Sequence, residues 1–264
     1  MKIAAAQISC VLGDIDANLC KIRDFSAQAR DGGADLVVFP EAAETGYAMP
    51  VIQSLATPWS EGAVPALQRM AKDLSIAIIC GVSEREGGSI YNSQVFIDAK
   101  GEIVGSYRKT HLFTAALIGE DTCFTPGNEL KGFPFGGCRL GLTICYDLRF
   151  PELYRMLAIE EQANVFILSA AWPFPRLEHF RILAAARAIE NQSYMIVSNR
   201  VGTDERVTCC GSSMIIDPYG VTLASASTDR EELIVAEVSE EAITAVRNKM
   251  AVFAQRRPDL YERR

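Results

Sequence analysis

Histidine is scarce in this 264-residue sequence, and closely spaced cysteine pairs are missing. Only two histidines, His111 and His179, are present, and none of the eight cysteines forms a C-x-x-C pair. Structural zinc sites usually combine these residue types in short, paired spacings. We therefore expect no structural zinc. The adjacent cysteines Cys209 and Cys210 leave a soft-metal or redox role open, although core packing is the simpler interpretation.

The sequence also lacks a long hydrophobic run and a basic stripe. No apolar stretch approaches the roughly 20 residues that a transmembrane helix needs, and the first residues show no signal-peptide pattern. There are 26 lysines and arginines against 33 aspartates and glutamates, which gives a formal net charge of −7. This balance disfavours binding to nucleic acids or acidic membranes. We expect a cytoplasmic protein that binds neither nucleic acid nor membrane.

Hydrophobic periodicity predicts an alternation of strands and helices. The continuously apolar run 35–40 is typical of a strand buried on both faces, and 16–30 carries apolar side chains at helical spacing before a Gly-Gly pair. The other expected strands are 2–8, 76–82, 91–98, 102–107, 139–145, 164–168, 194–198, the hairpin 212–225, and 232–238. The other expected helices are 63–74, 151–161, 177–190 and a short one before an arginine-rich tail.

The two predicted hairpins resemble each other in sequence. Residues 93–106 align without a gap on 212–225, and Asp98 and Asp217 each stand three residues before a glycine. Aspartate and glycine are common in turns, so the hairpins alone could reflect shared turn chemistry. The matching order of helices and strands favours a duplication.

Two such halves would pack sheet against sheet with helices outside, as a four-layer α-β-β-α sandwich of the α/β class. No linker-like stretch separates the halves. We predict a single domain over 1–264, with an extended C-terminal tail from about 252 to 264.

Cys145 stands apart from the other cysteines by its context. The apolar run 139–144 leads into it, and Pro151 then begins an amphipathic segment, which predicts a strand, a sharp turn and a helix. A thiol near a helix N-terminus is favoured as thiolate, the nucleophilic form. Cysteine is also among the most buried residue types. Cys145 is therefore either a nucleophile or a core residue on this evidence alone.

Two further segments place charged side chains where predicted strands end. Glu41 follows the strand 35–40, at the carboxyl end where α/β sheets commonly hold their sites, and a partly desolvated carboxylate there can act as a general base. Glu44 is expected to be the solvated neighbour. Arg108 and Lys109 follow a hairpin strand, and because side chains alternate along a strand, one of them should face inward.

A cysteine, a glutamate and a lysine meeting at such strand ends would form a consistent hydrolytic set. Glu41 would take the thiol proton, Lys109 would neutralise a developing oxyanion, and Cys145 would attack a carbonyl carbon. Solvated or helix-capping roles for the two charged residues remain the alternative.

Three short segments resemble, in this order, motifs of the nitrilase superfamily of carbon–nitrogen hydrolases. They are Phe-Pro-Glu at 39–41, Tyr-Arg-Lys-Thr-His-Leu-Phe at 107–113 and Cys-Tyr-Asp-Leu-Arg-Phe-Pro-Glu at 145–152. The later segments 186–191 and 217–220 are similar to that family too. The resemblance covers essentially the whole chain and implies the α-β-β-α sandwich fold.

The resemblance implies a role for each motif residue. Glu41 would be the general base, Lys109 the oxyanion-stabilising cation and Cys145 the nucleophile, with the backbone N–H of Tyr146 completing the oxyanion hole. The family often has a second glutamate in a G-E-x-x-x-F context, which Glu120 fits; it would position the substrate and the lysine. The neighbouring Asp121 is the competitor for that role.

The resemblance also suggests a substrate pocket. Arg149 would either face the pocket and bind a substrate carboxylate or form an ion pair with Asp147 or Glu152. The aromatic residues that would line the pocket, unless they pack in the core, are Tyr47, Trp172 and Phe174.

The implied activity is hydrolysis of a small carboxamide to a carboxylate and ammonia through a cysteine thioester, with no metal or organic cofactor. The motif around the cysteine is closest to ω-amidases, which act on monoamides of dicarboxylic acids. A nitrile or N-carbamoyl amino acid hydrolase is the alternative within the class, and a non-catalytic scaffold is the alternative outside it. The family usually forms homodimers, here through the helix 151–161, with the C-terminal tail as a second possible contact.

Overall fold

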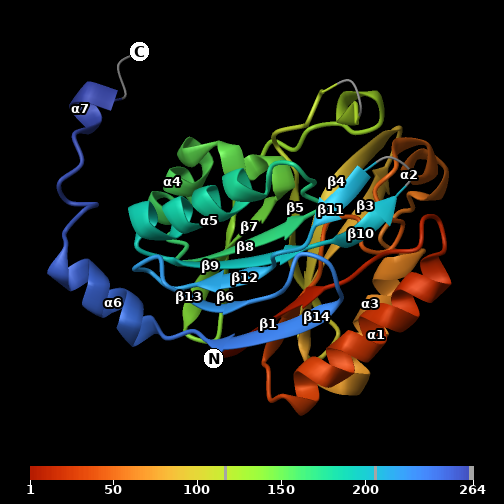
Figure 1. Cartoon of the computed structure of the whole chain (residues 1–264), viewed down its shortest axis with the longest axis horizontal. Helices are drawn as coiled ribbons and strands as arrows, with labels where there is room; N and C mark the ends of the chain where they lie inside the picture. Colours follow the sequence, from red (N-terminus) through yellow and green to blue (C-terminus); the bar gives the residue numbers. More distant parts are fainter. Residues whose placement is uncertain (116–117, 205–206, 262–264) are drawn as a thin grey trace.

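The computed structural model describes residues 1–115, 118–204 and 207–261, and two six-stranded sheets lie at its centre (Figure 1). The first sheet contains, in spatial order, β14 (Glu232–Glu237), β1 (Lys2–Gln7), β2 (Leu36–Val38), β3 (Ala77–Glu86), β4 (Ser89–Ile97) and β5 (Ile103–Arg108). The second contains β13 (Thr222–Ser225), β12 (Met214–Ile216), β9 (Tyr194–Asn199), β8 (Val165–Ala170), β7 (Cys138–Ile144) and β6 (Gly132–Phe135). A separate hairpin pairs β10 (Val201–Asp204) with β11 (Val207–Cys210).

Helices cover the outer faces of the two sheets (Figure 1). The first sheet is covered by α1 (Ile15–Asp31) and α3 (Ala63–Leu74), and the second by α4 (Pro151–Ile159) and α5 (Leu177–Asn191). The remaining helices are α2 (Met49–Leu55), the short 3₁₀ helices η1 (Glu120–Thr122) and η2 (Cys145–Arg149), α6 (Glu240–Lys249) and α7 (Pro258–Tyr261). No helix in these described ranges is both long enough and apolar enough to cross a membrane.

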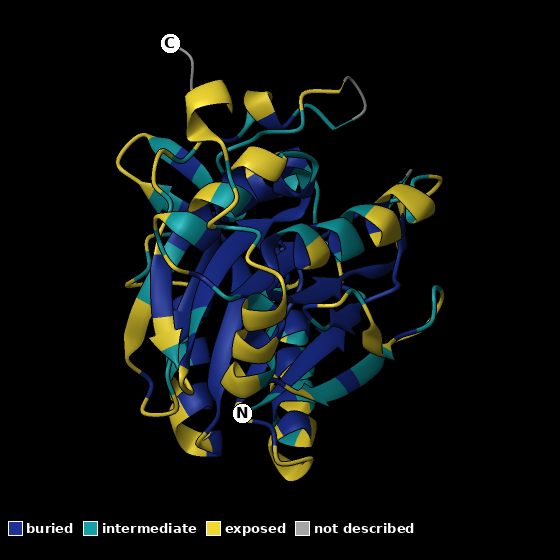
Figure 2. Cartoon of the chain, turned by 90° about the vertical axis from the view of Figure 1, so that its left-hand side faces the viewer, coloured by how far each residue is buried: buried dark blue, intermediate teal, exposed yellow. Residues whose placement is uncertain are grey.

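The alternating directions of the side chains along β1 show why the two sheets pack face to face. Ile3 and Ala5 pack in the cluster shared with the second sheet, whereas Ala4 and Ala6 pack with α1 and α3. Both faces of the strand are therefore buried, as side-chain alternation in a sheet between two layers requires. Figure 2 shows the same arrangement as buried strands between helices that expose their outer faces. The predicted α-β-β-α sandwich is confirmed.

The two halves correspond strand by strand. β1, β2 and β3 are mutually parallel, as are β7, β8 and β9, and each set continues into an antiparallel hairpin and is bordered by an antiparallel strand. The hairpin turns match in detail. Asp98 Oδ1 accepts backbone N–H bonds from the residues two and four positions on, and Asp217 Oδ1 does the same. Gly101 and Gly220, with φ of 84° and 83°, close the two turns. This correspondence supports the predicted duplication.

Several elements differ from the prediction. The strand β2 is shorter than 35–40, and β6, β10, β11 and α2 were not predicted. These are short elements with little periodicity, and β6 lies at a sheet edge, where a proline such as Pro134 is tolerated. The predicted tail from 252 includes the short helix α7, which lies away from the sheets (Figure 1), and its last residues, 262–264, fall outside the described part.

Candidate active site

Glu41 lies in the loop that follows β2, at the carboxyl end of the parallel strands. Its side chain is fully buried. Oε1 accepts hydrogen bonds from Lys109 Nζ at 2.9 Å and Asn92 Nδ2 at 2.7 Å, and Oε2 accepts one from the backbone N–H of Ala171 at 2.9 Å. Ala171 directly follows β8, so this carboxylate connects the two sheets. The loop lies so close to Gly81 that a Cβ there would come within 2.7 Å of the Glu41 Cα.

Lys109 follows β5 and points inward, as one member of the Arg108–Lys109 pair was predicted to do. Its ammonium is buried and donates to Glu120 Oε1 at 2.6 Å as well as to Glu41. Burial alone would lower the pKa of Lys109, but the two carboxylates raise it above its ordinary value. The lysine is therefore a permanent cation. Arg108 faces the other way and pairs with Glu84.

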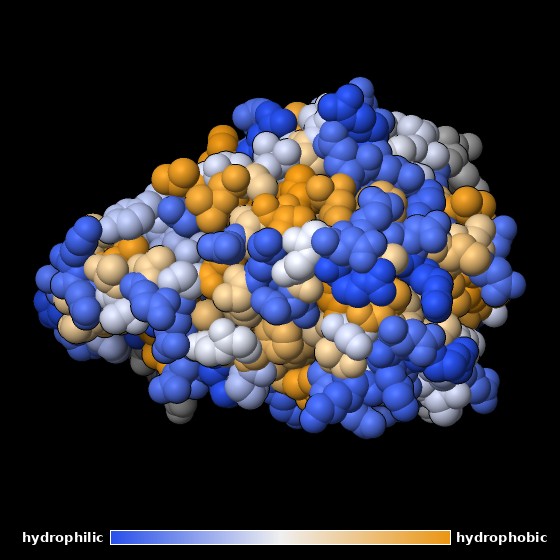
Figure 3. Space-filling model, turned by 90° about the horizontal axis from the view of Figure 1, so that it is seen from below, coloured by the Kyte–Doolittle hydropathy of each residue, from blue (hydrophilic) through white to orange (hydrophobic). Residues whose placement is uncertain are grey.

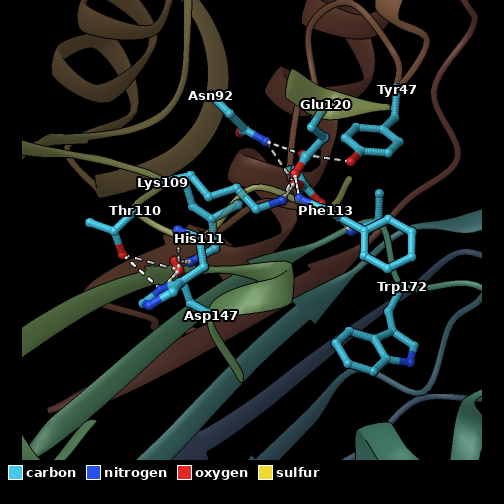
Figure 4. Close-up of polar contacts among 12 residues, drawn as sticks. Tyr47, Asn92, Lys109, Thr110, His111, Phe113, Glu120, Asp147 and Trp172 are labelled. Atoms are coloured by element: carbon cyan, nitrogen blue, oxygen red, sulfur yellow. Dashed lines mark hydrogen bonds and ion pairs between the residues drawn. The ribbon is translucent and has the colours of Figure 1, made fainter. Parts of the chain in front are cut away.

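Glu120 begins η1 and completes the buried cluster (Figure 4). Besides the bond from Lys109, Oε1 accepts bonds from Tyr47 Oη at 2.6 Å and Asn92 Nδ2 at 3.2 Å. Oε2 accepts the backbone N–H of Phe113 at 2.5 Å. The competing residue Asp121 is exposed.

Cys145 lies at the junction of β7 and η2, with a positive φ of 43°. Its thiol is buried. Burial and the Glu41 carboxylate raise the pKa of Cys145 well above its ordinary value, although Lys109 acts in the opposite direction. The expectation that a helix N-terminus would favour the thiolate was wrong, because α4 begins only at Pro151 and the cysteine starts a short 3₁₀ turn instead. The resting group is a thiol that needs a base.

Cys145 lines a small pocket that opens to the surface. Its walls are mostly aromatic and apolar, and two guanidinium groups complete them. The lining residues are Tyr47, Phe113, Ile118, Cys145, Tyr146, Arg149, Ala171, Trp172, Pro173 and Arg176.

The geometry agrees with comparisons to known proteins. The family model described as "Carbon-nitrogen hydrolase" matches residues 2–248. The chain belongs to the carbon–nitrogen hydrolase family. It is 37% identical to the 2-oxoglutaramate amidase of Bacillus subtilis over 96% of this chain and 98% of that protein.

Solved structures show the same fold. A carbon–nitrogen hydrolase from Helicobacter pylori G27 superimposes with a TM-score of 0.93 at 25% identity, covering 99% of this chain and 97% of that one. An amidase mutant from Nesterenkonia sp. AN1 gives 0.88 at 26% identity, covering 99% and 95%. In that amidase structure, the acetamide moiety of fluoroacetamide is added covalently to the active-site cysteine.

Arg149 of this carbon–nitrogen hydrolase faces the pocket. Its guanidinium lies 4.8 Å from the ring centre of Trp172 and 5.9 Å from that of Tyr146. Burial and the nearby Arg176 lower the pKa of Arg149. Among the described residues, neither arginine pairs with a carboxylate, so the alternative of an ion pair between Arg149 and Asp147 or Glu152 is wrong. Within the part of the chain that the structure describes, these two pocket cations therefore have no acidic partner.

Two other sequence-based expectations fail. Phe174, expected in the pocket, is 42% exposed and does not line it. Glu44, expected to be solvated, is buried, and its Oε1 accepts the backbone N–H of Ser83 at 2.5 Å. Burial raises the pKa of Glu44 to about 6. The whole stretch 36–46 is buried, so this loop runs inside the protein rather than over its surface.

The sequence analysis missed Asn92 and Arg176. Asn92 donates to both Glu41 and Glu120, and its carbonyl accepts the backbone N–H of Lys109 at 2.8 Å. No sequence pattern indicated Asn92. A simple hairpin between the predicted strands pairs it with Arg108, and the bulge between Phe96 and Ile97 shifts the register so that Asn92 lies opposite Lys109. Arg176 had no signal either, because its place in the pocket depends on how the loop after β8 folds.

The described ranges contain no group of three or more histidine, cysteine, aspartate or glutamate side chains that could hold a metal ion. Cys209 and Cys210 are both buried, and burial raises the pKa of each thiol, to about 12 and about 11. Both cysteines pack as core residues.

Proposed function

We propose that this carbon–nitrogen hydrolase cleaves small carboxamides to carboxylate and ammonia through a thioester on Cys145. The observation that carries the proposal is the buried cluster of Glu41, Lys109 and Glu120 beside the cysteine pocket. Two carboxylates and one ammonium without solvent are costly to assemble, and such clusters of coupled ionisable groups occur mainly at functional sites. The covalent cysteine adduct of the Nesterenkonia amidase supports the same assignment.

In the first stage, Glu41 accepts the proton of Cys145 and the sulfur attacks the amide carbon. Lys109 and the backbone N–H of Tyr146 stabilise the oxyanion of the tetrahedral intermediate. The carbon–nitrogen bond then breaks, and Glu41 returns the proton to the departing ammonia. The product on the enzyme is a thioester.

In the second stage, Glu41 takes a proton from water, and the resulting hydroxide attacks the thioester carbon. Collapse of the second intermediate releases the carboxylic acid, and the thiol of Cys145 recovers its proton. Glu120 holds the lysine in place by its 2.6 Å contact throughout the cycle. The cluster supplies every proton transfer, so this mechanism requires no cofactor.

The pocket supports an acyl group that ends in a carboxylate. Arg149 offers a planar pair of donors beside Trp172, and Tyr47 closes the side next to Glu120. Guanidinium groups recognise carboxylates through paired hydrogen bonds. A relative that is 37% identical is named for 2-oxoglutaramate, an amide that carries a carboxylate. We therefore assign the substrate to the ω-monoamides of dicarboxylic acids.

A homodimer through α4 and α5 fits the surface of the chain. Met156, Ile182 and Ile189 are 46%, 63% and 52% exposed on these two helices. Apolar patches of this kind commonly mark subunit contacts. Figure 3 shows a different face, seen from below, where exposed apolar side chains are interspersed with polar ones. Sedimentation as a monomer at micromolar concentration would contradict the dimer.

A screen for ammonia release tests the proposed activity. The panel should contain ω-monoamides, neutral amides, nitriles and N-carbamoyl amino acids, each with the wild type and with Cys145→Ala. We expect release from amides only, fastest with a carboxylate at the far end, and none from the variant. Release from nitriles alone, or equal release by the variant, would overturn the assignment.

A further inference from the structure

The Asp147 carboxylate is the most heavily hydrogen-bonded side chain beside the site. It is fully buried and lies two residues after Cys145. Oδ2 accepts the backbone N–H of Ile144 at 2.9 Å and the hydroxyl of Tyr107 at 2.8 Å. Oδ1 accepts the backbone N–H of His111 at 3.2 Å and, in the tautomer protonated there, its Nδ1 at 2.9 Å. The hydroxyl of Thr110 adds a contact of 3.3 Å.

These contacts connect two separate segments of the chain (Figure 4). The bond from Ile144 closes the turn in which Cys145 adopts its positive φ of 43°. A non-glycine residue in this left-handed conformation is strained and persists only where surrounding contacts hold it. The bonds from Tyr107 and His111 come from residues two positions before and two positions after Lys109. The Asp147 carboxylate thus holds both the turn at Cys145 and the stretch from Lys109 to Phe113, which we call the lysine segment.

The lysine segment is also held at its far end. Glu120 accepts the backbone N–H of Phe113 at 2.5 Å, so the stretch from Lys109 to Phe113 is fixed by one carboxylate at each end. His111 additionally stacks on Phe150, which follows the cysteine turn, with 3.8 Å between the ring centres. Asp147 does not line the pocket and cannot touch a substrate.

We propose that Asp147 is a positioning residue that fixes the Cys145 turn relative to the Lys109 segment, so that the sulfur and the ammonium stay aligned on one reacting carbon. This inference rests on the proposed amide hydrolysis. Its physical basis is that misplacing a reacting group by about 1 Å can cost about 100-fold in rate.

The site requires a carboxylate rather than an amide. All of the contacts are donated to Asp147, and a carboxylate only accepts. Asparagine would turn an NH₂ group toward N–H or O–H donors on one of its two sides. The backbone N–H on that side, that of Ile144 or that of His111, would then lose its acceptor in a buried place, where unpaired polar groups are costly.

The experiment compares Asp147→Asn with Asp217→Asn as a matched control. Asp217 also accepts two backbone N–H bonds in a turn, but it lies in the remote hairpin. For each protein, kcat and KM for an ω-monoamide are measured, together with the rate of Cys145 alkylation by iodoacetamide. We expect kcat of Asp147→Asn to fall by roughly 10- to 100-fold, KM to change by less than about threefold, and alkylation to slow. The control should match the wild type.

Tyr107→Phe and His111→Gln serve as weaker variants if Asp147→Asn does not fold. Each removes one donor and should lower kcat by several-fold at constant KM. Wild-type kcat in a folded Asp147→Asn, or in both weaker variants, would overturn the proposal. A loss of kcat/KM that comes entirely from a higher KM, with kcat unchanged, would overturn it too. Alkylation rates need no turnover, so they test the positioning role even if no amide proves to be a substrate.

Discussion

The carboxylates of Glu41 and Glu120 meet at one ammonium group, that of Lys109, at distances of 2.9 and 2.6 Å. Asn92 donates to the same two carboxylates from the opposite hairpin strand. Since the two carboxylates raise the pKa of Lys109, the lysine cannot serve as a base, and proton transfer is left to a glutamate. The cluster therefore separates a fixed cation from a proton acceptor within one buried site.

Replacing the cation should damage both stability and activity. In Lys109→Met, two buried carboxylates lose their shared partner, and breaking a buried ion pair from one side typically costs about 3–5 kcal/mol. We expect a loss of this order in the free energy of unfolding measured by urea titration. The turnover number should fall by about 100-fold or more, because an oxyanion donor is gone. A stable variant with normal turnover would contradict the role of the lysine.

Neighbouring acidic residues should behave differently. Glu120→Gln changes a buried acceptor that has four donors, and we expect kcat to fall by about 100-fold. Asp121→Asn changes the exposed residue beside it and should leave kcat within about twofold of the wild type. Steady-state ammonia assays on both proteins check this pair. Similar losses of kcat in the two variants would show that activity depends on the integrity of this short helix rather than on the Glu120 carboxylate.

The pocket arginines should select for charge on the substrate. Arg149→Ala and Arg176→Ala remove one guanidinium each, and a charge-assisted hydrogen bond contributes about 1.5–3 kcal/mol. We expect kcat/KM for an ω-monoamide of a dicarboxylic acid to fall by roughly 10- to 100-fold. For a neutral amide of the same length, kcat/KM should stay nearly constant. Equal losses of kcat/KM on both substrates would show that these arginines do not recognise a substrate carboxylate.

Glu44 should make stability depend on pH. Burial raises its pKa from 4.5 to about 6 in the folded protein, so the folded state binds this proton more tightly than the unfolded chain does. The resulting stabilisation is complete below pH 4.5 and is lost as the pH rises through 6. It amounts to about 2 kcal/mol.

Glu44→Gln removes this titration. We expect its free energy of unfolding, relative to the wild type, to improve by about 2 kcal/mol between pH 4.5 and pH 7. The exposed Glu61→Gln serves as the control and should show a nearly flat difference. A flat difference for Glu44→Gln as well would show that the carboxyl is not titrating in this range.

The layers of the fold could be predicted from the sequence because they follow from local patterns. Apolar runs and helical periodicity located the long strands and helices, and the repeated Asp–Gly turns indicated the two halves. Short elements such as β6, β10 and β11 have no comparable pattern. Their pairing depends on neighbours that are distant in the sequence.

The residues of the candidate site that stand at strand ends could also be predicted from the sequence. Glu41, Lys109 and Cys145 each stand where a strand ends, and the structure places the first two in direct contact. The burial of Glu44, the exposure of Phe174 and the position of Arg176 depend on loop paths that no local rule determines. The pKa of Cys145 was misjudged because burial and a nearby carboxylate outweigh the effect of a distant helix end.

The central claim is that Cys145 carries the acyl group during turnover. Rapid acid quenching of the enzyme with an ω-monoamide, followed by mass spectrometry of the peptide that contains Cys145, tests it most directly. The account predicts a mass increase equal to the substrate minus ammonia, removable by hydroxylamine and absent in Cys145→Ala. Undiminished ammonia release by Cys145→Ala, with no adduct on that peptide in the wild type, would contradict it.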